Sequence, residues 1–406
     1  MRIGSLWLSC LLLLAPAAQA KTSEYDVTYT IGFEPAQGEA IVSIAIEQRE
    51  QARVSRLVFD MPEARYSAIE GDGKISRTGG KLAWEPPTKG GELRYRYRID
   101  HSRSNGAFDA RIAKDFAIVR GDDLVPSASV KATRGADSRA RLRLELPPGW
   151  PHADTPWKLA KDGKSYVVVN AERSFDRPTG WIIAGDIGVR RDVVEGMEIA
   201  VGAPKGEPMP RMQILSMLTA TAPAMREAFG TLPPKLLIVG AGDPMWRGGL
   251  SGPRSLWMHA ERPLISENGS STLMHETVHV VTRIRGAKGE DWIAEGFAEY
   301  YGIELMRRAG LLSEARFDKT IGWMRKHGRK VKTLRADSSA GPRTARAVAM
   351  LSDLDAEIRQ HAPNRSLDDV ARALMGRGRV SSEDLRTEAQ AVIGAPSKVL
   401  QSALPD

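Results

Sequence analysis

Apolar and polar residues alternate through much of the first half of the chain, which is the pattern of strands that bury one face. Glycine and proline clusters at 79–80, 86–87 and 147–149 separate these segments and are typical of turns. Many short strands at this spacing favour a β-sandwich. The predicted strands are 25–33, 40–47, 54–61, 92–99, 140–146, 166–170 and 181–187.

Beyond Pro208 the apolar residues recur at helical spacing. One long helix is predicted to end at Gly230, and another to start after the N-cap candidates 270–272 and end near Gly286. Gly310 is expected just past the end of a third helix. The predicted helices are 211–229, 273–286, 291–308, 344–359 and a segment from Ser366, with strands at 235–239 and 255–259.

These patterns predict an α+β chain with several domains. We expect a β-rich N-terminal domain over 21–200, a domain with both helices and strands over 201–310, and a helical C-terminal lobe over 311–406. Nothing in the sequence indicates the oligomeric state.

The first 20 residues have the features of a secretory signal peptide. Arg2 supplies the positive charge, residues 6–14 form a short apolar run, and Ala18-Gln19-Ala20 is a cleavage site. We therefore expect a periplasmic or secreted protein that has no stable membrane insertion after cleavage; a membrane anchor is the alternative. Cleavage removes Cys10, the one cysteine, so no disulfide is expected.

The net charge of +8 raises the question of nucleic-acid binding. The basic residues are scattered along the chain, and no zinc-finger or RNA-binding motif accompanies them. Scattered charge of this kind is typical of a solvated surface. Nucleic acid is therefore not an expected partner, whereas acidic peptides are mildly favoured.

The segment His275-Glu276-Thr277-Val278-His279 is an H-E-x-x-H motif. Residues four apart lie on one face of a helix, so His275 and His279 present two imidazoles to one point, as two ligands of a zinc ion must. Glu276 lies beside them, within reach of a proton on a water at the metal. Glu295 and Glu299 share one face of the next predicted helix; two solvated carboxylates are the alternative.

The H-E-x-x-H motif followed by W-x-x-E-G-F-A-E-Y-Y at 292–301 resembles the gluzincin metallopeptidases, in particular the aminopeptidase-N and glycyl-aminopeptidase groups. The resemblance implies a thermolysin-like α/β catalytic domain and one Zn²⁺ per chain, with His275, His279 and Glu295 as ligands and Glu276 as general base. It also implies that Glu299 orients a ligand imidazole, that of His275. The 15 residues between His279 and Glu295 are fewer than is usual in the family, so Glu299 stays open as the alternative ligand.

The same resemblance identifies two departures. The family's glycyl-aminopeptidase group has a glutamate after Gly-Gly-Leu that anchors the substrate amino terminus, and this chain has Ser251 there. We therefore favour endopeptidase or other peptide hydrolysis over strict aminopeptidase activity. The strand at 255–259 is expected to be the edge strand that pairs with an extended substrate, with an ordinary edge strand as the alternative. His259 on that strand is not expected to be a ligand.

The second departure concerns the stabiliser of the developing oxyanion. The family uses a tyrosine in Tyr-x-Lys-Gly, and the corresponding position here is Thr344; no tyrosine follows Tyr301. Loss of one such donor typically costs about 10²–10³ in rate. Arg343, Arg346 and His327 are the candidate replacements, and for each a surface cation is the alternative.

These observations predict zinc-dependent hydrolysis of peptide bonds in the cell envelope or outside the cell, with a peptide or protein as substrate. The alternative is a catalytically weakened or inactive peptidase-like protein that binds peptides. Its support is the missing tyrosine and the missing amine-anchoring glutamate, and the intact Glu276 counts against it.

Overall fold

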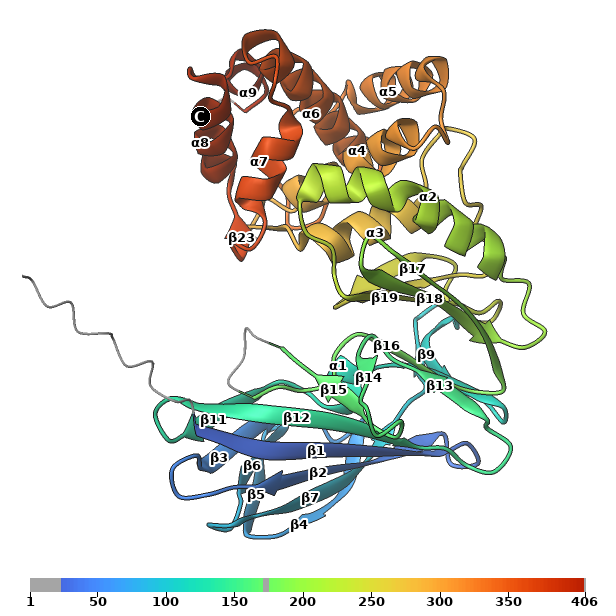
Figure 1. The fold of residues 1–406 in the computed structure, drawn as a ribbon, viewed down its shortest axis with the longest axis vertical. Helices are drawn as coiled ribbons and strands as arrows, with labels where there is room; N and C mark the ends of the chain where they lie inside the picture. The colour runs from blue at the N-terminus through green and yellow to red at the C-terminus, as the bar shows by residue number, and fades with distance from the viewer. Residues whose placement is uncertain (1–22, 171–174, 405–406) are drawn as a thin grey trace, which may run out of the picture.

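The computed structural model describes residues 23–170 and 175–404. Strands build the N-terminal part, a sheet with helices forms the middle, and the C-terminal part is helical (Figure 1). The mixed α and β architecture predicted from the sequence is therefore confirmed. The predicted signal peptide at 1–20 lies outside the described residues. Within the described ranges no helix is both long and apolar enough to cross a membrane.

Two sheets in the N-terminal part share one hydrophobic core, which buries alternate residues such as Tyr29 and Ile31 from one sheet and Phe59 from the other. In spatial order the larger sheet consists of β14 (Lys158–Leu159), β15 (Tyr166–Val168), β12 (Ala136–Glu145), β1 (Ser23–Glu34), β2 (Glu39–Glu47), β7 (Gly90–Arg98) and β4 (Tyr66–Gly71). The smaller consists of β11 (Ala128–Ala132), β3 (Val54–Asp60), β6 (Lys81–Glu85) and β5 (Lys74–Thr78).

A third sheet joins this sandwich to the middle of the molecule. Its strands are, in order, β13 (His152–Asp154), β16 (Trp181–Gly185), β10 (Phe116–Arg120), β9 (Phe108–Ile112) and β8 (His101–Ser102); the short helix α1 (Gly121–Leu124) follows β10. Ile118 and Ile183 on one face of this sheet pack against Leu237, Val239 and Trp257 of the next sheet. The N-terminal and middle parts therefore share a core.

The middle sheet has the order β17 (Ile187–Val194), β18 (Met197–Pro204), β19 (Lys235–Val239), β21 (Ser255–Met258) and β20 (Gly249–Gly252). β17 and β18 form a hairpin, because Glu195 and Gly196 adopt the positive φ values of 51° and 75° that a tight two-residue turn requires. β18 pairs with β19 in parallel. The sheet therefore begins at Ile187, earlier than the predicted domain boundary at 201, because the hairpin carries residues 187–200 into it.

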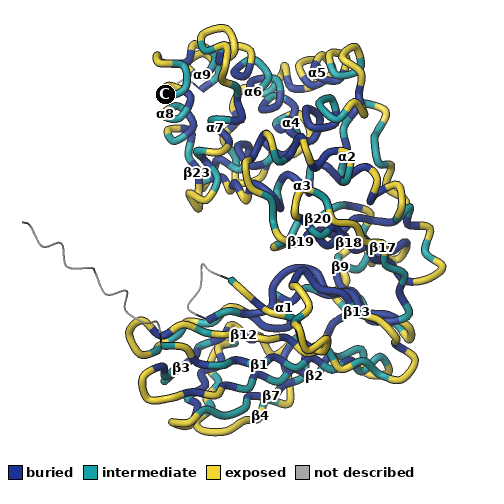
Figure 2. The backbone as a smooth tube through the Cα atoms, in the orientation of Figure 1, coloured by how far each residue is buried: buried dark blue, intermediate teal, exposed yellow. Residues whose placement is uncertain are grey.

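One face of the middle sheet packs against the third sheet. Helices cover the opposite face and continue into the C-terminal lobe (Figure 1). They are α2 (Arg211–Phe229), α3 (Thr272–Thr282), α4 (Trp292–Arg308), α5 (Glu314–Gly328), α6 (Pro342–His361), α7 (Leu367–Leu374), α8 (Ser382–Ile393) and α9 (Lys398–Ala403). Two short strands, β22 (Arg285–Gly286) and β23 (Arg379–Val380), connect the loop after α3 to the loop after α7. Exposed residues gather on the peripheral loops (Figure 2).

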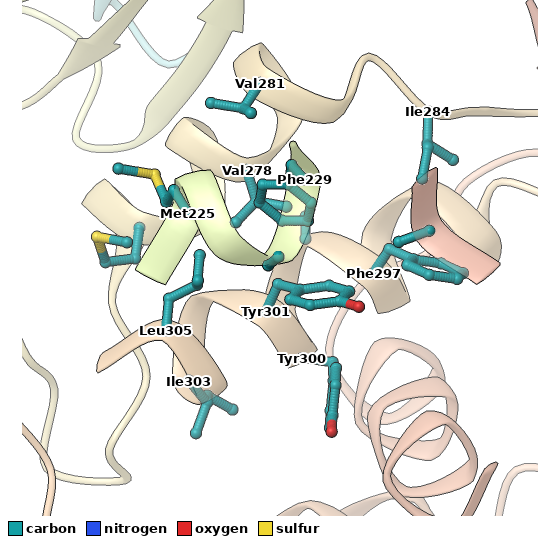
Figure 3. Close-up of a cluster of buried hydrophobic side chains, with 14 of the residues drawn as sticks. Met225, Phe229, Val278, Val281, Ile284, Phe297, Tyr300, Tyr301, Ile303 and Leu305 are labelled. Atoms are coloured by element: carbon teal, nitrogen blue, oxygen red, sulfur yellow. The ribbon is translucent and has the colours of Figure 1, made fainter. Parts of the chain in front are cut away.

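Helix α4 is apolar on nearly all sides and is buried at the centre of the helical part. Figure 3 shows Met225 and Phe229 of α2 lying against Val278 of α3 and Tyr301 of α4. The Phe229 and Tyr301 ring centroids are 4.9 Å apart with their planes near the edge-to-face arrangement. The Tyr301 hydroxyl donates to Asp368 of α7 at 2.9 Å, so the polar end of this ring is satisfied by the C-terminal lobe.

Candidate metal centre

Helix α3 carries the H-E-x-x-H segment and starts where the sequence placed its cap. The Oγ of Ser271 accepts a hydrogen bond from the Met274 backbone N–H at 3.3 Å. Leu273 and Val278 are fully buried against the core, so the opposite face of the helix turns His275 and His279 outward.

The end of α3 differs from the prediction. The helix ends with Arg283 as the C-cap residue in the left-handed conformation, at φ 55°, three residues before Gly286. Gly286 lies instead in β22, where a Cβ atom would stand 2.2 Å from the Glu290 carbonyl oxygen. The glycine is therefore needed for a close backbone approach, and its predicted role as C-cap is wrong.

Helix α4 brings two carboxylates to the two imidazoles. The Nε2 atoms of His275 and His279 are 3.1 Å apart. One Glu295 carboxylate oxygen lies 3.3 Å from the first of these nitrogens and the other oxygen lies 3.3 Å from the second. Glu299 lies on the opposite side of His275, with Oε2 2.8 Å from Nδ1. The geometry thus groups Glu295 with the histidine pair and places Glu299 behind it.

This donor set fits a tetrahedral zinc ion. Bonds of 2.0–2.1 Å at tetrahedral angles place neighbouring ligand atoms about 3.3 Å apart. The two nitrogens are 3.1 Å apart, and each lies 3.3 Å from a different oxygen of Glu295, so these separations are close to that value. When Nδ1 of His275 donates its proton to Glu299, Nε2 keeps a free lone pair that faces the other donors. His275, His279 and Glu295 are the residues that could hold a metal.

The imidazoles and carboxylates at the centre shift one another's pKa values. Burial by itself would lower the pKa of His275, but its hydrogen bonds with Glu295 and Glu299 outweigh burial and raise that pKa to about 10. Burial would raise the pKa of Glu295, but the two imidazoles hold it down at about 2. The two opposed shifts show that this site favours a positive charge beside its carboxylates, and a bound cation supplies such a charge.

A cavity of about 590 Å³ opens at the histidine pair. Glu276 lines it and is itself buried, and its carboxylate makes no hydrogen bond to any residue within the described ranges. Gly249 of β20 lies directly beside it, because a Cβ atom on Gly249 would be 3.0 Å from Cγ of Glu276. The cavity is lined by Arg120, 249–253, His275, Glu276, His279, Val280, 283–286, Asp291, Ala294, Glu295 and Arg379.

The edge strand of the middle sheet that lines the cavity is β20, and the prediction of 255–259 as that strand is wrong. β21 lies inside the sheet between β19 and β20. The sequence signal misleads because the apolar run of β21 resembles a strand, while the stretch Gly249-Leu250-Ser251-Gly252 has few strand-forming residues. His259 is buried behind this hairpin, with Nε2 3.4 Å from Asp243, and does not line the cavity.

The three candidate oxyanion stabilisers do not reach this cavity. Arg343 donates to the Ser338 carbonyl at 3.2 Å. Arg346 lines a separate cavity between α5, α6 and α9. His327 stacks on Trp323 with ring centroids 4.6 Å apart. The sequence placed only Arg346 on a predicted helix, 344–359, and none of the three residues is among those that line the cavity at the histidine pair.

Four arginines line the cavity, and the sequence analysis missed them as site residues: Arg120, Arg283, Arg285 and Arg379. Arg283 and Arg285 directly follow the H-E-x-x-H helix, so their position along the chain was an available signal. Arg120 and Arg379 come from the ends of β10 and the β22–β23 pair, and no local pattern marks them.

Comparisons with models of protein families and with curated proteins find no match. Solved structures do match. An aminopeptidase N family protein from Idiomarina loihiensis has a TM-score of 0.62 at 14% identity, over 93% of this chain and 72% of that one. Legionella pneumophila aminopeptidase A, in complex with aspartic acid, has a TM-score of 0.56 at 13% identity, over 95% of this chain and 50% of that one. At these identities the similarity shows that the chain shares its fold with these aminopeptidases.

Proposed function

We propose that this chain is a zinc-dependent peptide hydrolase. The observation that carries the proposal is the placement of donor atoms of His275, His279 and Glu295 within 4.8 Å of one another, in the cavity that Glu276 also lines. Two imidazoles and one carboxylate are a ligand set of catalytic zinc, which keeps a fourth position open. The aminopeptidase names of two structures with the same fold add support by analogy.

A zinc ion at this centre would act as a Lewis acid and lower the pKa of water. Glu276 accepts the proton of the attacking water and passes it to the leaving amine, a role for which its unbonded carboxylate is suited. Glu299 holds His275 by Nδ1 and fixes its tautomer. None of the described residues that line the cavity is a tyrosine, so the oxyanion has no phenolic donor there.

Strand β20 is the proposed platform for the substrate backbone. It is an edge strand that lines the cavity, and its glycines at 249 and 252 let another chain approach closely. The Leu250 carbonyl already accepts from Trp181 Nε1 at 3.0 Å, which fixes the strand in place. Ser251 supplies no carboxylate for a substrate amino terminus, so we infer cleavage inside peptides. The signal-like residues 1–20 favour a periplasmic or secreted site of action.

The proposal is tested by digesting a mixed peptide library with the wild-type protein and with Glu276→Gln, and by reading the product ends by mass spectrometry. We expect new ends from the wild type only, their loss on chelation, and equal zinc content in both proteins. A Glu276→Gln protein that hydrolyses at the wild-type rate would contradict the general-base role.

The second candidate is a zinc-loaded protein that binds peptides without cutting them. The lack of a tyrosine in the sequence after Tyr301 favours it. Folded, zinc-loaded wild type that leaves the whole library intact, yet retains peptides on a column, would establish this alternative and overturn hydrolysis.

A further inference from the structure

The arginines around the cavity are an unusual feature of a site that also holds a metal donor set. Among the described residues, four guanidinium groups and three carboxylates line the cavity. Two of those carboxylates, Glu276 and Glu295, belong to the metal centre. The third, Asp291, accepts a hydrogen bond from the Ser339 backbone N–H at 2.7 Å.

The four arginines gather at one end of the cavity, which we call the arginine end. Gly249 lies beside Thr272 and Glu276 near the start of α3, whereas Gly252, at the other end of β20, lies beside Gly180 and Trp181. Arg120 of β10 pairs in register with Trp181 of the adjacent strand β16. β20 and α3 therefore run in the same direction, and both end at the arginine end.

Arg285 and Arg379 face each other in register across the parallel β22–β23 pair, and both are exposed. Like charges directly opposite in a sheet destabilise the pairing. Arg379 donates one hydrogen bond, to the Gly286 carbonyl at 3.1 Å. In the described part of the chain neither guanidinium has a carboxylate partner. The pair thus presents two charges that an anion in the cavity would neutralise.

Arg120 adds a third group with spare donors. Its guanidinium lies 5.8 Å from the Trp181 ring centroid and 3.5 Å from Asp122, which is a weak contact. Its Nε is buried and has no hydrogen-bond partner among the described residues. Asp122 is already shared with the Gly180 backbone N–H and with Arg177.

The positive field also acts on a neighbour outside the cavity. Burial, and after it the charge of Arg283, lowers the pKa of the Arg254 guanidinium. Arg254 follows β20 in the hairpin turn, so the field extends to the place where a bound chain would leave the strand.

We propose that the arginine end binds a carboxylate of the peptide substrate, two or three residues from the bond that is cut. This inference rests on the proposed function, which makes the substrate a peptide. The anionic groups of an unmodified peptide are carboxylates. The distance follows from the elements: β20 spans about 10 Å at the rise of a strand, which two or three residues of extended peptide cover. Guanidinium groups match carboxylates by paired hydrogen bonds.

The carboxylate has two sources, an Asp or Glu side chain or the free carboxy terminus of the peptide. They differ in the direction in which the substrate lies along β20. A chain antiparallel to β20 places the residues before the scissile bond at the arginine end, and a parallel chain places the carboxy terminus there.

The test uses quenched fluorescent peptides in matched pairs. One set has blocked ends and carries Glu or Gln at each of three positions on either side of the cleavage site. A second set has neutral side chains and a free or amidated carboxy terminus. We measure kcat/KM for the wild type, Arg285→Gln, Arg379→Gln and the double variant, at low and high salt. Arg377→Gln is the matched control, because this exposed arginine lies in the same loop and does not line the cavity.

We expect the wild type to favour the carboxylate member of one set by about tenfold or more, the range for hydrogen bonds to charged groups. The double variant should lose that preference, because its kcat/KM falls more on the acidic than on the neutral peptides. Arg377→Gln should keep the preference, and salt should reduce it. The set that shows the effect identifies the source of the carboxylate.

Cleavage without any preference, or a preference that survives the double variant, would overturn the carboxylate site and leave the proposed function intact. A binding measurement identifies the opposite case, in which the carboxylate site exists and the proposed hydrolysis does not. Dissociation constants of the same peptides for Glu276→Gln, with and without Arg285→Gln and Arg379→Gln, report carboxylate recognition without turnover. Tighter binding of the acidic peptide by Glu276→Gln, together with a wild type that cuts none of the peptides, would support the site and contradict hydrolysis. Equal binding of the two peptides would overturn the site.

Discussion

Glu299 contacts one histidine of the proposed metal centre from the side opposite the other donors. Its carboxylate lies 2.8 Å from Nδ1 of His275, whereas Glu295 faces the Nε2 atoms of both histidines. The four-residue spacing of the two glutamates makes this possible, because α4 presents both to one side, one turn apart. One helix therefore supplies a proposed ligand and the group that orients another.

We expect Glu299→Ala to weaken zinc binding about 10- to 100-fold, because His275 would lose the partner that fixes its tautomer. Competition with a chromogenic chelator measures the affinity. Glu299→Gln keeps an oxygen that can accept from Nδ1 and should lose less. Glu314→Ala removes an exposed carboxylate from α5 and is the control. Wild-type affinity in Glu299→Ala would contradict the orienting role.

At the scale of elements, the sequence predicted α2 with the same ends that the structure shows, 211–229, because Gly230 and the prolines after it end the helical pattern. It also predicted that His275, Glu276 and His279 share a helix. It could not show that β20 is the edge strand, since strand order depends on contacts between distant segments. Arg379 reaches the cavity through the two-residue pair β22–β23, which is too short to have a periodic pattern.

Strand β20 and helix α3 approach each other closely at Gly249. A Cβ atom there would lie 2.5 Å from Cγ2 of Thr272 and 3.0 Å from Cγ of Glu276, so one of these side chains has to move. We expect Gly249→Ala to lower kcat by about 100-fold, the effect of misplacing a reacting group by about 1 Å, and to leave zinc content unchanged.

Gly322→Ala is the control for Gly249→Ala, since nothing lies within 4 Å of the Cβ position at Gly322 in α5. Metal analysis and steady-state kinetics are made on the same preparations. Full activity of Gly249→Ala would mean that Glu276 is not held by β20.

At the scale of the whole molecule, a buried ion pair ties the N-terminal sheets to the middle sheet. Lys235 Nζ at the start of β19 lies 2.7 Å from Asp154 Oδ1 on β13, and both side chains are almost fully buried. Asp154 also contacts Arg191 of β17. Together with the shared core around Leu237 and Trp257, this contact joins two parts of the chain that the sequence pattern divides into separate domains.

We expect Lys235→Ala to lower the free energy of unfolding by about 3 kcal/mol, because it leaves Asp154 buried with one partner fewer. Urea titration followed by circular dichroism measures the change. Lys205→Ala breaks an exposed pair with Asp186 and should cost about 1 kcal/mol or less. Equal midpoints for Lys235→Ala and the wild type would show that the pair does not stabilise the junction.

The burial of α4 also affects the order in which the parts of the chain can pack during synthesis. Its Tyr300 and Tyr301 hydroxyls donate to Asp355 and Asp368, and Arg308 pairs with Asp368 as well. Asp355 and Asp368 follow their tyrosines by 55 and 67 positions, and a buried polar group without its partner is costly. During synthesis, we therefore expect α4 to complete its packing only after α6 and α7 have emerged. Because Glu295 lies on α4, we expect the proposed donor set to be assembled late, after α6 and α7 have been synthesised.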